Sequence, residues 1–183
     1  AMSSSLVGSE MCIRDRYKGS HGLVSFSPDS KYLITAMQEN EIHAWRLRDK
    51  DNLKMSGYPA KVKSFDWVGN TPYLVTSGAN QAICWPFDGK DGPKGRKPIC
   101  VADGGKQYST FIKSLPDEEA IFTGFRDGTV LLSEIDENKN ANIIRNPTGA
   151  EVTTIALTSD RSHILIGDSK GSILWSTLWA GRE

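Results

Sequence analysis

Hydrophobic and polar residues alternate along this chain in short runs, and the runs return at a nearly constant spacing. Residues 24–36 (VSFSPDSKYLITA) align with residues 65–77 (FDWVGNTPYLVTS) at an offset of 41 residues. The same pattern returns at residues 111–124 and again at 154–167, so the period lies in the forties with some variation in loop length. A fixed period of this size is typical of folds that are built from repeated units.

Each unit contains the same parts in the same order. In the first unit, apolar runs at residues 23–26, 32–35 and 41–45 are separated by polar turns, and a weaker run follows at 53–55. Short runs of β-favouring residues bounded by turn-forming residues predict strands, and their hairpin spacing predicts that they are antiparallel. No window carries a convincing helical period. Four strands in each unit are typical of a blade of a β-propeller.

The repeats predict an all-β fold of about four blades over residues 17–183. The blade boundaries are expected near residues 17–57, 58–103, 104–146 and 147–183, and the last blade is expected to end just after its third strand. One four-stranded sheet cannot bury both of its faces, so neighbouring blades must supply the core.

The first unit carries the clearest motif. It places His21 ahead of the first run, a Phe-Ser-Pro-Asp-Ser turn after that run, and Trp45 at the end of the third run. These features resemble WD40 repeats, and the resemblance covers essentially all of residues 17–183. In that family a His, a Ser or Thr, an Asp and the Trp form a buried hydrogen-bonded set within a blade. The resemblance implies this role for His21, Thr35 and Trp45, with Glu39 in place of the Asp.

The other units match less completely. The second unit keeps Trp85, and the fourth ends its third run in Trp175. The third unit keeps Asp127 and Gly128 but has Ser133 where the Trp is usual. The resemblance implies structural roles within the blades for these repeat positions.

Most WD40 proteins lack an activity of their own, so the resemblance implies a non-catalytic scaffold that binds other proteins. The candidate partner-binding residues are Trp67, Phe125 and Arg126, because aromatic and Arg side chains dominate protein interfaces. Trp67 also fits packing in the core, since it alternates with Phe65. Two alternatives stay open, a propeller-form enzyme of the hydrolase or lactonase kind and a targeting module of a larger enzyme whose N-terminal part is missing.

Candidate chemistry is sparse. The chain holds no nucleophile-elbow, P-loop, zinc-protease or dinucleotide-binding motif. His21, His43 and His163 lie in different repeats, so no cofactor or metal is expected. Cys84 and Cys100 are interpreted as small buried strand residues, with a thiol pair as the alternative.

Two charged segments have simple interpretations. The insert at residues 88–98 contains four cations that would suit phosphate and a pattern that faintly resembles a calcium loop, but a solvated connector between the third and fourth strands is favoured. The acidic residues 117–119 are expected in a solvated hairpin turn.

Composition narrows the classes of partner. The 22 basic and 22 acidic side chains give a formal net charge of zero, which provides no electrostatic reason for a nucleic-acid or membrane partner. No stretch approaches the roughly 20 apolar residues of a membrane span. The cysteine usage indicates a reduced, cytoplasmic setting.

Residues 6–16 (LVGSEMCIRDR) have no periodicity, unlike the repeats that follow. Their reverse translation resembles a transposon-end adapter used in preparing sequencing libraries, so residues 1–16 are interpreted as a non-native tail, with a natural disordered tail as the alternative. This hypothesis places missing blades or domains upstream of Tyr17. A partial propeller of this kind would leave sheet faces or edges open, and we expect it to self-associate.

Overall fold

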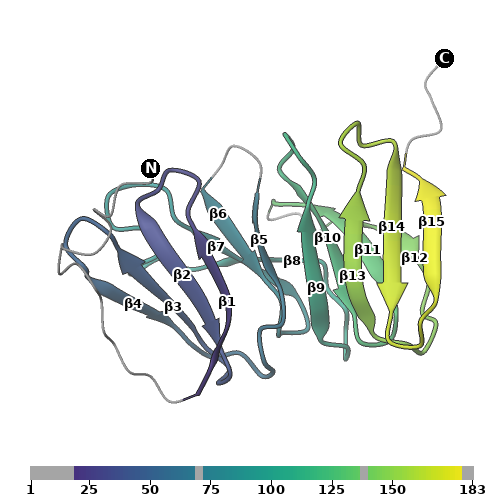
Figure 1. Cartoon of the computed structure of the whole chain (residues 1–183), viewed down its shortest axis with the longest axis horizontal. Helices are drawn as coiled ribbons and strands as arrows, with labels where there is room; N and C mark the ends of the chain where they lie inside the picture. The colour runs from purple at the N-terminus through teal and green to yellow at the C-terminus, as the bar shows by residue number, and fades with distance from the viewer. Residues whose placement is uncertain (1–18, 69–71, 137–139, 179–183) are drawn as a thin grey trace, which may run out of the picture.

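The computed structural model describes residues 19–68, 72–136 and 140–178, and residues 1–16, with the adapter-like run, lie outside this part. Over the described residues the chain forms fifteen strands in four antiparallel sheets, and it forms no helix. Figure 1 shows the four sheets standing side by side in chain order. The predicted all-β fold of about four blades is confirmed.

Within each sheet every strand pairs with its neighbours in the chain. Blade 1 consists of β1 (His21–Phe26), β2 (Tyr32–Met37), β3 (Ile42–Arg46) and β4 (Asn52–Met55). Blade 2 consists of β5 (Phe65–Val68), β6 (Tyr73–Thr76), β7 (Ala82–Pro86) and β8 (Ile99–Val101). Blade 3 consists of β9 (Ser109–Ser114), β10 (Ala120–Phe125), β11 (Val130–Glu134) and β12 (Ala141–Arg145). Blade 4 has three strands among the described residues, β13 (Val152–Leu157), β14 (His163–Asp168) and β15 (Ile173–Thr177).

The first strands of neighbouring blades approach one another, because β9 contacts both β5 and β13. Polar side chains join these inner strands. Asp66 of β5 accepts hydrogen bonds from the backbone amide and the hydroxyl of Ser114 in β9, both at 2.9 Å. Thr110 of β9 donates to the backbone carbonyl of Val152 in β13 at 2.7 Å. The inner strands therefore hold blades 2, 3 and 4 in a fixed order.

A buried ion pair joins blades 3 and 4 away from the inner strands. Nη2 of Arg145, at the end of β12, lies 2.6 Å from Oδ2 of Asp168, at the end of β14, and the two side chains are 10% and 1% exposed. The hydrogen bond from Arg145 lowers the pKa of Asp168, and backbone amides of the following turn bond to its other oxygen. Asp168 is therefore held in its charged form between the two blades.

The apolar cores lie between the blades, as a stack of sheets requires. Ile34 and Ile42 of blade 1 pack with Leu74 and Phe87 of blade 2 in the first core. Equivalent cores join blade 2 to blade 3 and blade 3 to blade 4. Each internal sheet thus uses one face for the preceding blade and the other for the following blade.

Candidate protein-interaction surface

The first repeat contains a hydrogen bond between His21 and Thr35. Nδ1 of His21, at the start of β1, lies 3.1 Å from Oγ1 of Thr35 in β2. Trp45 is buried near the end of β3. Glu39 lies exposed between β2 and β3. The structure therefore brings His21 and Thr35 together and places Glu39 at the surface.

In the second repeat, Tyr58 supplies the group that joins the Thr to the Trp. Nε1 of Trp85 donates to the Tyr58 hydroxyl at 2.6 Å, and that hydroxyl lies 2.8 Å from Oγ1 of Thr76. The Thr76 hydroxyl donates in turn to the backbone carbonyl of Ile83 at 3.2 Å. Because the Thr76 hydroxyl donates its only proton to Ile83, the Tyr58 hydroxyl is the donor in its bond with Thr76. Burial raises the pKa of Tyr58 to about 12, so its hydroxyl keeps its proton at neutral pH.

The strand register corrects the prediction for Trp175. In blades 1 and 2 the Trp of the third strand lies opposite the residue two positions before the Thr of the second strand. The equivalent residue of blade 4 is Ser176, opposite Ile164. Trp175 lies opposite Leu165, one position away, so its side chain is on the other face of the sheet and is exposed.

Asp127 and Gly128 form the turn between β10 and β11. Oδ1 of Asp127 accepts a hydrogen bond from the amide of Thr129 at 3.0 Å. Gly128 has a φ of +96°, and a Cβ atom there would lie 2.2 Å from Oγ1 of Thr148. Only glycine fits this position, because both the backbone conformation and the neighbouring blade exclude a side chain.

Phe125 and Arg126 are adjacent in sequence but differ in exposure. Phe125 ends β10 and is fully buried, with its ring against Gly104. The prediction that it binds a partner is therefore wrong. Arg126 is exposed, and its guanidinium lies 5.8 Å from the ring centroid of Tyr108. Arg126 remains a surface candidate.

Trp67 lies in the joint between blades 1 and 2 and is half-buried. Its Nε1 donates to the hydroxyl of Ser25 in β1 at 3.1 Å, and its ring meets Phe87 edge-on with centroids 5.2 Å apart. These contacts match the alternative interpretation of Trp67 as a packing residue.

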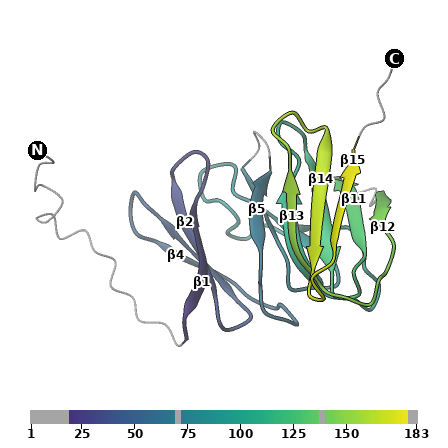
Figure 2. The same ribbon diagram turned by 45° about the vertical axis from the view of Figure 1, so that its right-hand side comes forward.

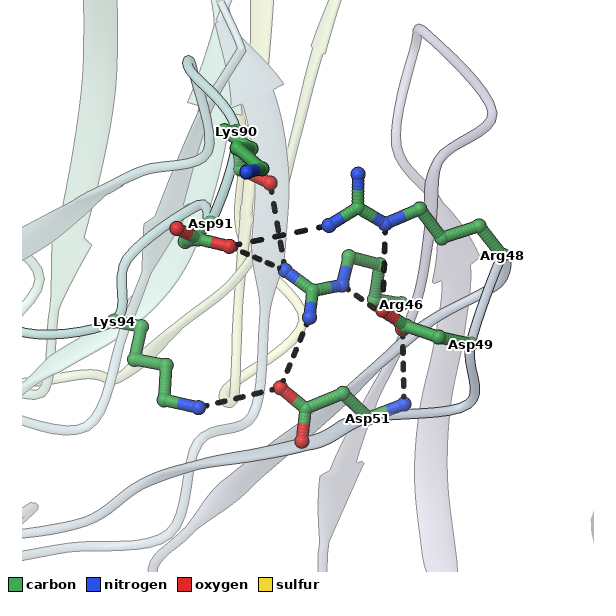
Figure 3. A network of polar contacts seen from close by, with 7 residues as sticks. All are labelled: Arg46, Arg48, Asp49, Asp51, Lys90, Asp91 and Lys94. Carbon is green, nitrogen blue, oxygen red and sulfur yellow. Dashed lines mark hydrogen bonds and ion pairs between the residues drawn. The ribbon is translucent and has the colours of Figure 1, made fainter.

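Figure 3 shows a charged network that fastens the insert of blade 2 to blade 1. Arg46, at the end of β3, donates to Asp49 at 2.9 Å, to Asp51 at 3.2 Å and to Asp91 of the insert at 2.7 Å. Lys94 of the insert reaches Asp51 at 3.3 Å. The hydrogen bond from Arg46 lowers the pKa of Asp49 to about 2. The network therefore stays charged at neutral pH.

The insert at residues 88–98 connects β7 to β8, which are the third and fourth strands of blade 2. Two of its four cations pair with carboxylates of the chain itself, Lys94 with Asp51 of blade 1 and Arg96 with Asp88 within the insert. These pairs disfavour a phosphate site and make the insert a fixed wall beside blade 1.

Two hollows adjoin along the outer strand of blade 1. One, of about 280 Å³, lies between β4 and residues 93–95 of the insert. The other, of about 320 Å³, lies beside residues 56–58 and reaches Pro98. Trp85 borders both hollows, and the chain is continuous along their other side from residue 52 to 58. We call the combined depression the β4 groove.

The remaining candidate groups give no reactive centre. The register pairs Ile83 with Cys100 and Cys84 with Ile99, so the two thiols lie on opposite faces of the sheet, and they do not form a disulfide bond. Burial raises the pKa of the Cys84 thiol. Residues 117–119 line an open hollow of about 390 Å³. Within the described part of the chain no three His, Cys, Asp or Glu side chains gather as metal ligands.

Known proteins resemble the chain at low identity. No family model matches it. The LEC14B homolog of Prunus armeniaca is 26% identical over 113 residues, which are 61% of this chain and 24% of that protein. The angio-associated migratory cell protein of Homo sapiens is 23% identical over 154 residues, which are 82% of this chain and 34% of that protein. A ribosome biogenesis protein WDR12 homolog of Drosophila mojavensis is 22% identical over 95 residues, which cover 44% of this chain and 23% of that protein.

Solved structures share the fold. The β-propeller domain of Cps50 (Swd1) from Myceliophteria thermophila aligns with a TM-score of 0.67 at 15% identity, over 89% of this chain and 53% of that one. The WD40 repeats of RRP9 align with a TM-score of 0.64 at 19% identity, over 85% and 45% of the two chains. The chain therefore has the blade fold of these WD40 β-propellers. A chain of the mitotic checkpoint complex also aligns, with a TM-score of 0.68 at 15% identity over 87% and 51% of the two chains.

The chain spans about a quarter to a third of the length of these curated relatives. It spans about half of the solved chains. None of its described residues forms a helix that is long and apolar enough to cross a membrane.

Proposed function

We propose that this chain is a non-catalytic scaffold that binds other proteins. Its relatives are WD-repeat proteins, and one fold neighbour comes from the mitotic checkpoint complex. Stacked blades with fixed joints present a rigid surface, which lowers the ordering cost of binding. The relatives do not favour the alternative of a hydrolase or lactonase. A cytoplasmic location, a lack of nucleic-acid and membrane partners, and the absence of a cofactor belong to the same proposal.

The observation that carries this proposal is the β4 groove. β4 is the last strand of its sheet and pairs only with β3, so its other edge carries backbone groups that no strand of the sheet uses. An extended segment of a partner binds such an edge through backbone hydrogen bonds and places alternate side chains in adjoining pockets. Trp85 and Pro98 provide the apolar surface for those side chains. Figure 3 shows why the opposite wall is in place before binding, because Arg46 and Lys94 fix the insert.

The test compares the proteins captured by the chain with those captured by a variant whose groove is filled. Ser56 is exposed and lines the groove, so Ser56→Trp puts a large side chain into it. Ser159 is exposed in a hairpin turn of blade 4, so Ser159→Trp is the matched control. We expect quantitative mass spectrometry to show proteins that are retained by the wild-type chain and by Ser159→Trp but lost with Ser56→Trp. Capture that is the same with all three chains would refute binding in the groove, and no capture above background would refute the scaffold.

A further inference from the structure

The apolar end of the β4 groove is suited to an apolar side chain. This hollow of about 320 Å³ is lined by Tyr58, Ile83, Trp85 and Pro98, among others. The polar groups of the two aromatic side chains are already used, because Nε1 of Trp85 donates to the Tyr58 hydroxyl at 2.6 Å and that hydroxyl also bonds to Thr76. A ligand therefore meets mainly carbon atoms here. The volume is at the low end of the range of about 300–1,000 Å³ for ligand pockets, so the hollow has room for one large side chain.

The walls of the groove are positively charged. Residues 52–58 and 88–98 provide five cations but only two carboxylates, although the whole chain has a formal net charge of zero. The five cations are Lys54, Lys90, Lys94, Arg96 and Lys97. Among the described residues that line the groove itself, the only charged side chains are those of Lys54 and Lys94. A partner segment therefore meets an excess of positive charge along the groove, and opposite charge favours its binding.

Lys97 carries a positive charge beside the apolar hollow. It is exposed and stands directly before Pro98, which lines that hollow. Lys94 and Arg96 are paired with carboxylates of the chain, whereas no ion pair among the described residues includes Lys97. Its ammonium group is therefore available to a carboxylate of a partner. A phosphate is disfavoured, because phosphorylated motifs are bound by clusters of Arg side chains and the single Arg of the insert is paired with Asp88.

We infer that the partner of the β4 groove is an extended, acidic segment of another protein. One large apolar side chain of that segment enters the hollow beside Trp85, and Asp or Glu side chains pair with the lysines of the groove. Alternate residues of an extended chain lie on the same face, about 7 Å apart. Lys54 and Lys94 line the adjoining hollow, so the acidic residues are expected two or four positions from the apolar one. This inference rests on the proposed function, because it names the partner of that same groove.

Selection from a random library of short peptides displayed on phage tests this inference with the 183-residue chain. The baits are the wild-type chain, Ser56→Trp, which fills the groove, and the control Ser159→Trp. Ser159 lies between β13 and β14, which Figure 2 shows at the far end of the row of sheets from β4. The wild-type chain and Ser159→Trp are expected to enrich peptides that carry Asp or Glu two or four positions from Phe, Leu or Trp. Ser56→Trp is expected not to enrich them.

A charge reversal then tests which side chain meets the acid. The most enriched peptide is labelled with a fluorophore, and a second copy carries Asn and Gln in place of Asp and Glu. In fluorescence anisotropy, Lys97→Glu is expected to raise the dissociation constant of the acidic peptide about fivefold, which is the size of an exposed ion pair, and to leave that of the neutral copy unchanged. Lys170→Glu is the matched control, because Lys170 is exposed between β14 and β15 of blade 4. It is expected to leave both constants unchanged.

The outcomes separate this inference from the proposed function. Peptides that need the open groove but show no preference for Asp or Glu would overturn the acidic partner and support the groove. Acidic peptides that bind Ser56→Trp as tightly as the wild-type chain would overturn it too, because they bind elsewhere. If no peptide is enriched on the wild-type chain, the inference fails, and the capture of whole proteins decides on the scaffold separately. Unchanged far-ultraviolet circular dichroism shows that the variants are folded.

Discussion

Removing the hydroxyl of Tyr58 tests the hydrogen-bonded chain of the second repeat. In Tyr58→Phe the ring stays and Nε1–H of Trp85 loses its acceptor, while Thr76 still donates to the Ile83 carbonyl. Leaving the Trp85 N–H without an acceptor costs about 1–3 kcal/mol. The lost hydrogen bond to Thr76 adds little, because it leaves only the Thr76 hydroxyl oxygen without a donor. We therefore expect the free energy of unfolding to fall by about 2 kcal/mol.

Urea unfolding, followed by circular dichroism at one fixed protein concentration, measures this change. With a slope of about 2 kcal/mol per molar urea, the midpoint is expected to fall by about 1 M. Tyr108→Phe is the matched control. Tyr108 is half-buried, and its ring is held by stacking under Arg126, which does not involve its hydroxyl. A Tyr58→Phe midpoint equal to that of the control would refute the bridging role of the hydroxyl.

Three further outcomes are expected. Burial raises the pKa of Tyr58 to about 12, whereas Tyr in the unfolded chain titrates near 10.0. The contribution of the protonated Tyr58 hydroxyl to stability is therefore fully present below pH 10.0 and is lost as the pH rises toward 12. Urea midpoints measured across this range are expected to fall less steeply for Tyr58→Phe than for the wild-type chain. Gly128→Ala is expected to cost about 2 kcal/mol or more in thermal unfolding, since strain and a clash act together. Gly149→Ala, also at positive φ but with open space around it, is expected to cost about 1 kcal/mol. Arg46→Ala releases the insert, so limited proteolysis at residues 88–98 is expected to be about fivefold faster. Lys31→Ala is the control, because it removes a cation of blade 1 that pairs with Asp29, and it is expected to leave the cleavage rate unchanged.

The positions of the strands could be predicted from the sequence because the signals for them are local. Period-two alternation and turn-forming residues are properties of a few consecutive residues, and they located all four strands of blade 1. The repeat period then added the stacking of blades, since a single sheet has two faces to bury. The polar insert was also placed between the correct strands of blade 2.

The direction of individual side chains could not be predicted in the same way. In the sequence, Phe125 stands next to Arg126 and looks like a loop residue. In the structure β10 continues through Phe125 after a register shift at Gly124, and the ring is buried. Trp175 changes face because the register sets it one position away from the Trp of the other blades. A shift of one residue exchanges the two faces of a strand, and alignment of sequences cannot fix that shift where loop lengths vary.

Two contacts between distant segments also required the tertiary structure. Tyr58 lies before the first strand of its blade, outside any periodic run, and only packing brings its hydroxyl to Trp85. Arg46 and Asp91 are separated by 45 residues, and their pairing holds the insert, whose residues 93–95 line the β4 groove.

The sequence by itself thus determined the class of fold, the number of blades in this chain and the order of their strands, because these follow from local periodicity and from its repetition. The tertiary structure decided which faces are covered, which groups bond across blades and where the open surfaces lie. Those properties depend on the register of neighbouring strands and on the stacking of neighbouring blades, and neither is a property of any one segment of the chain.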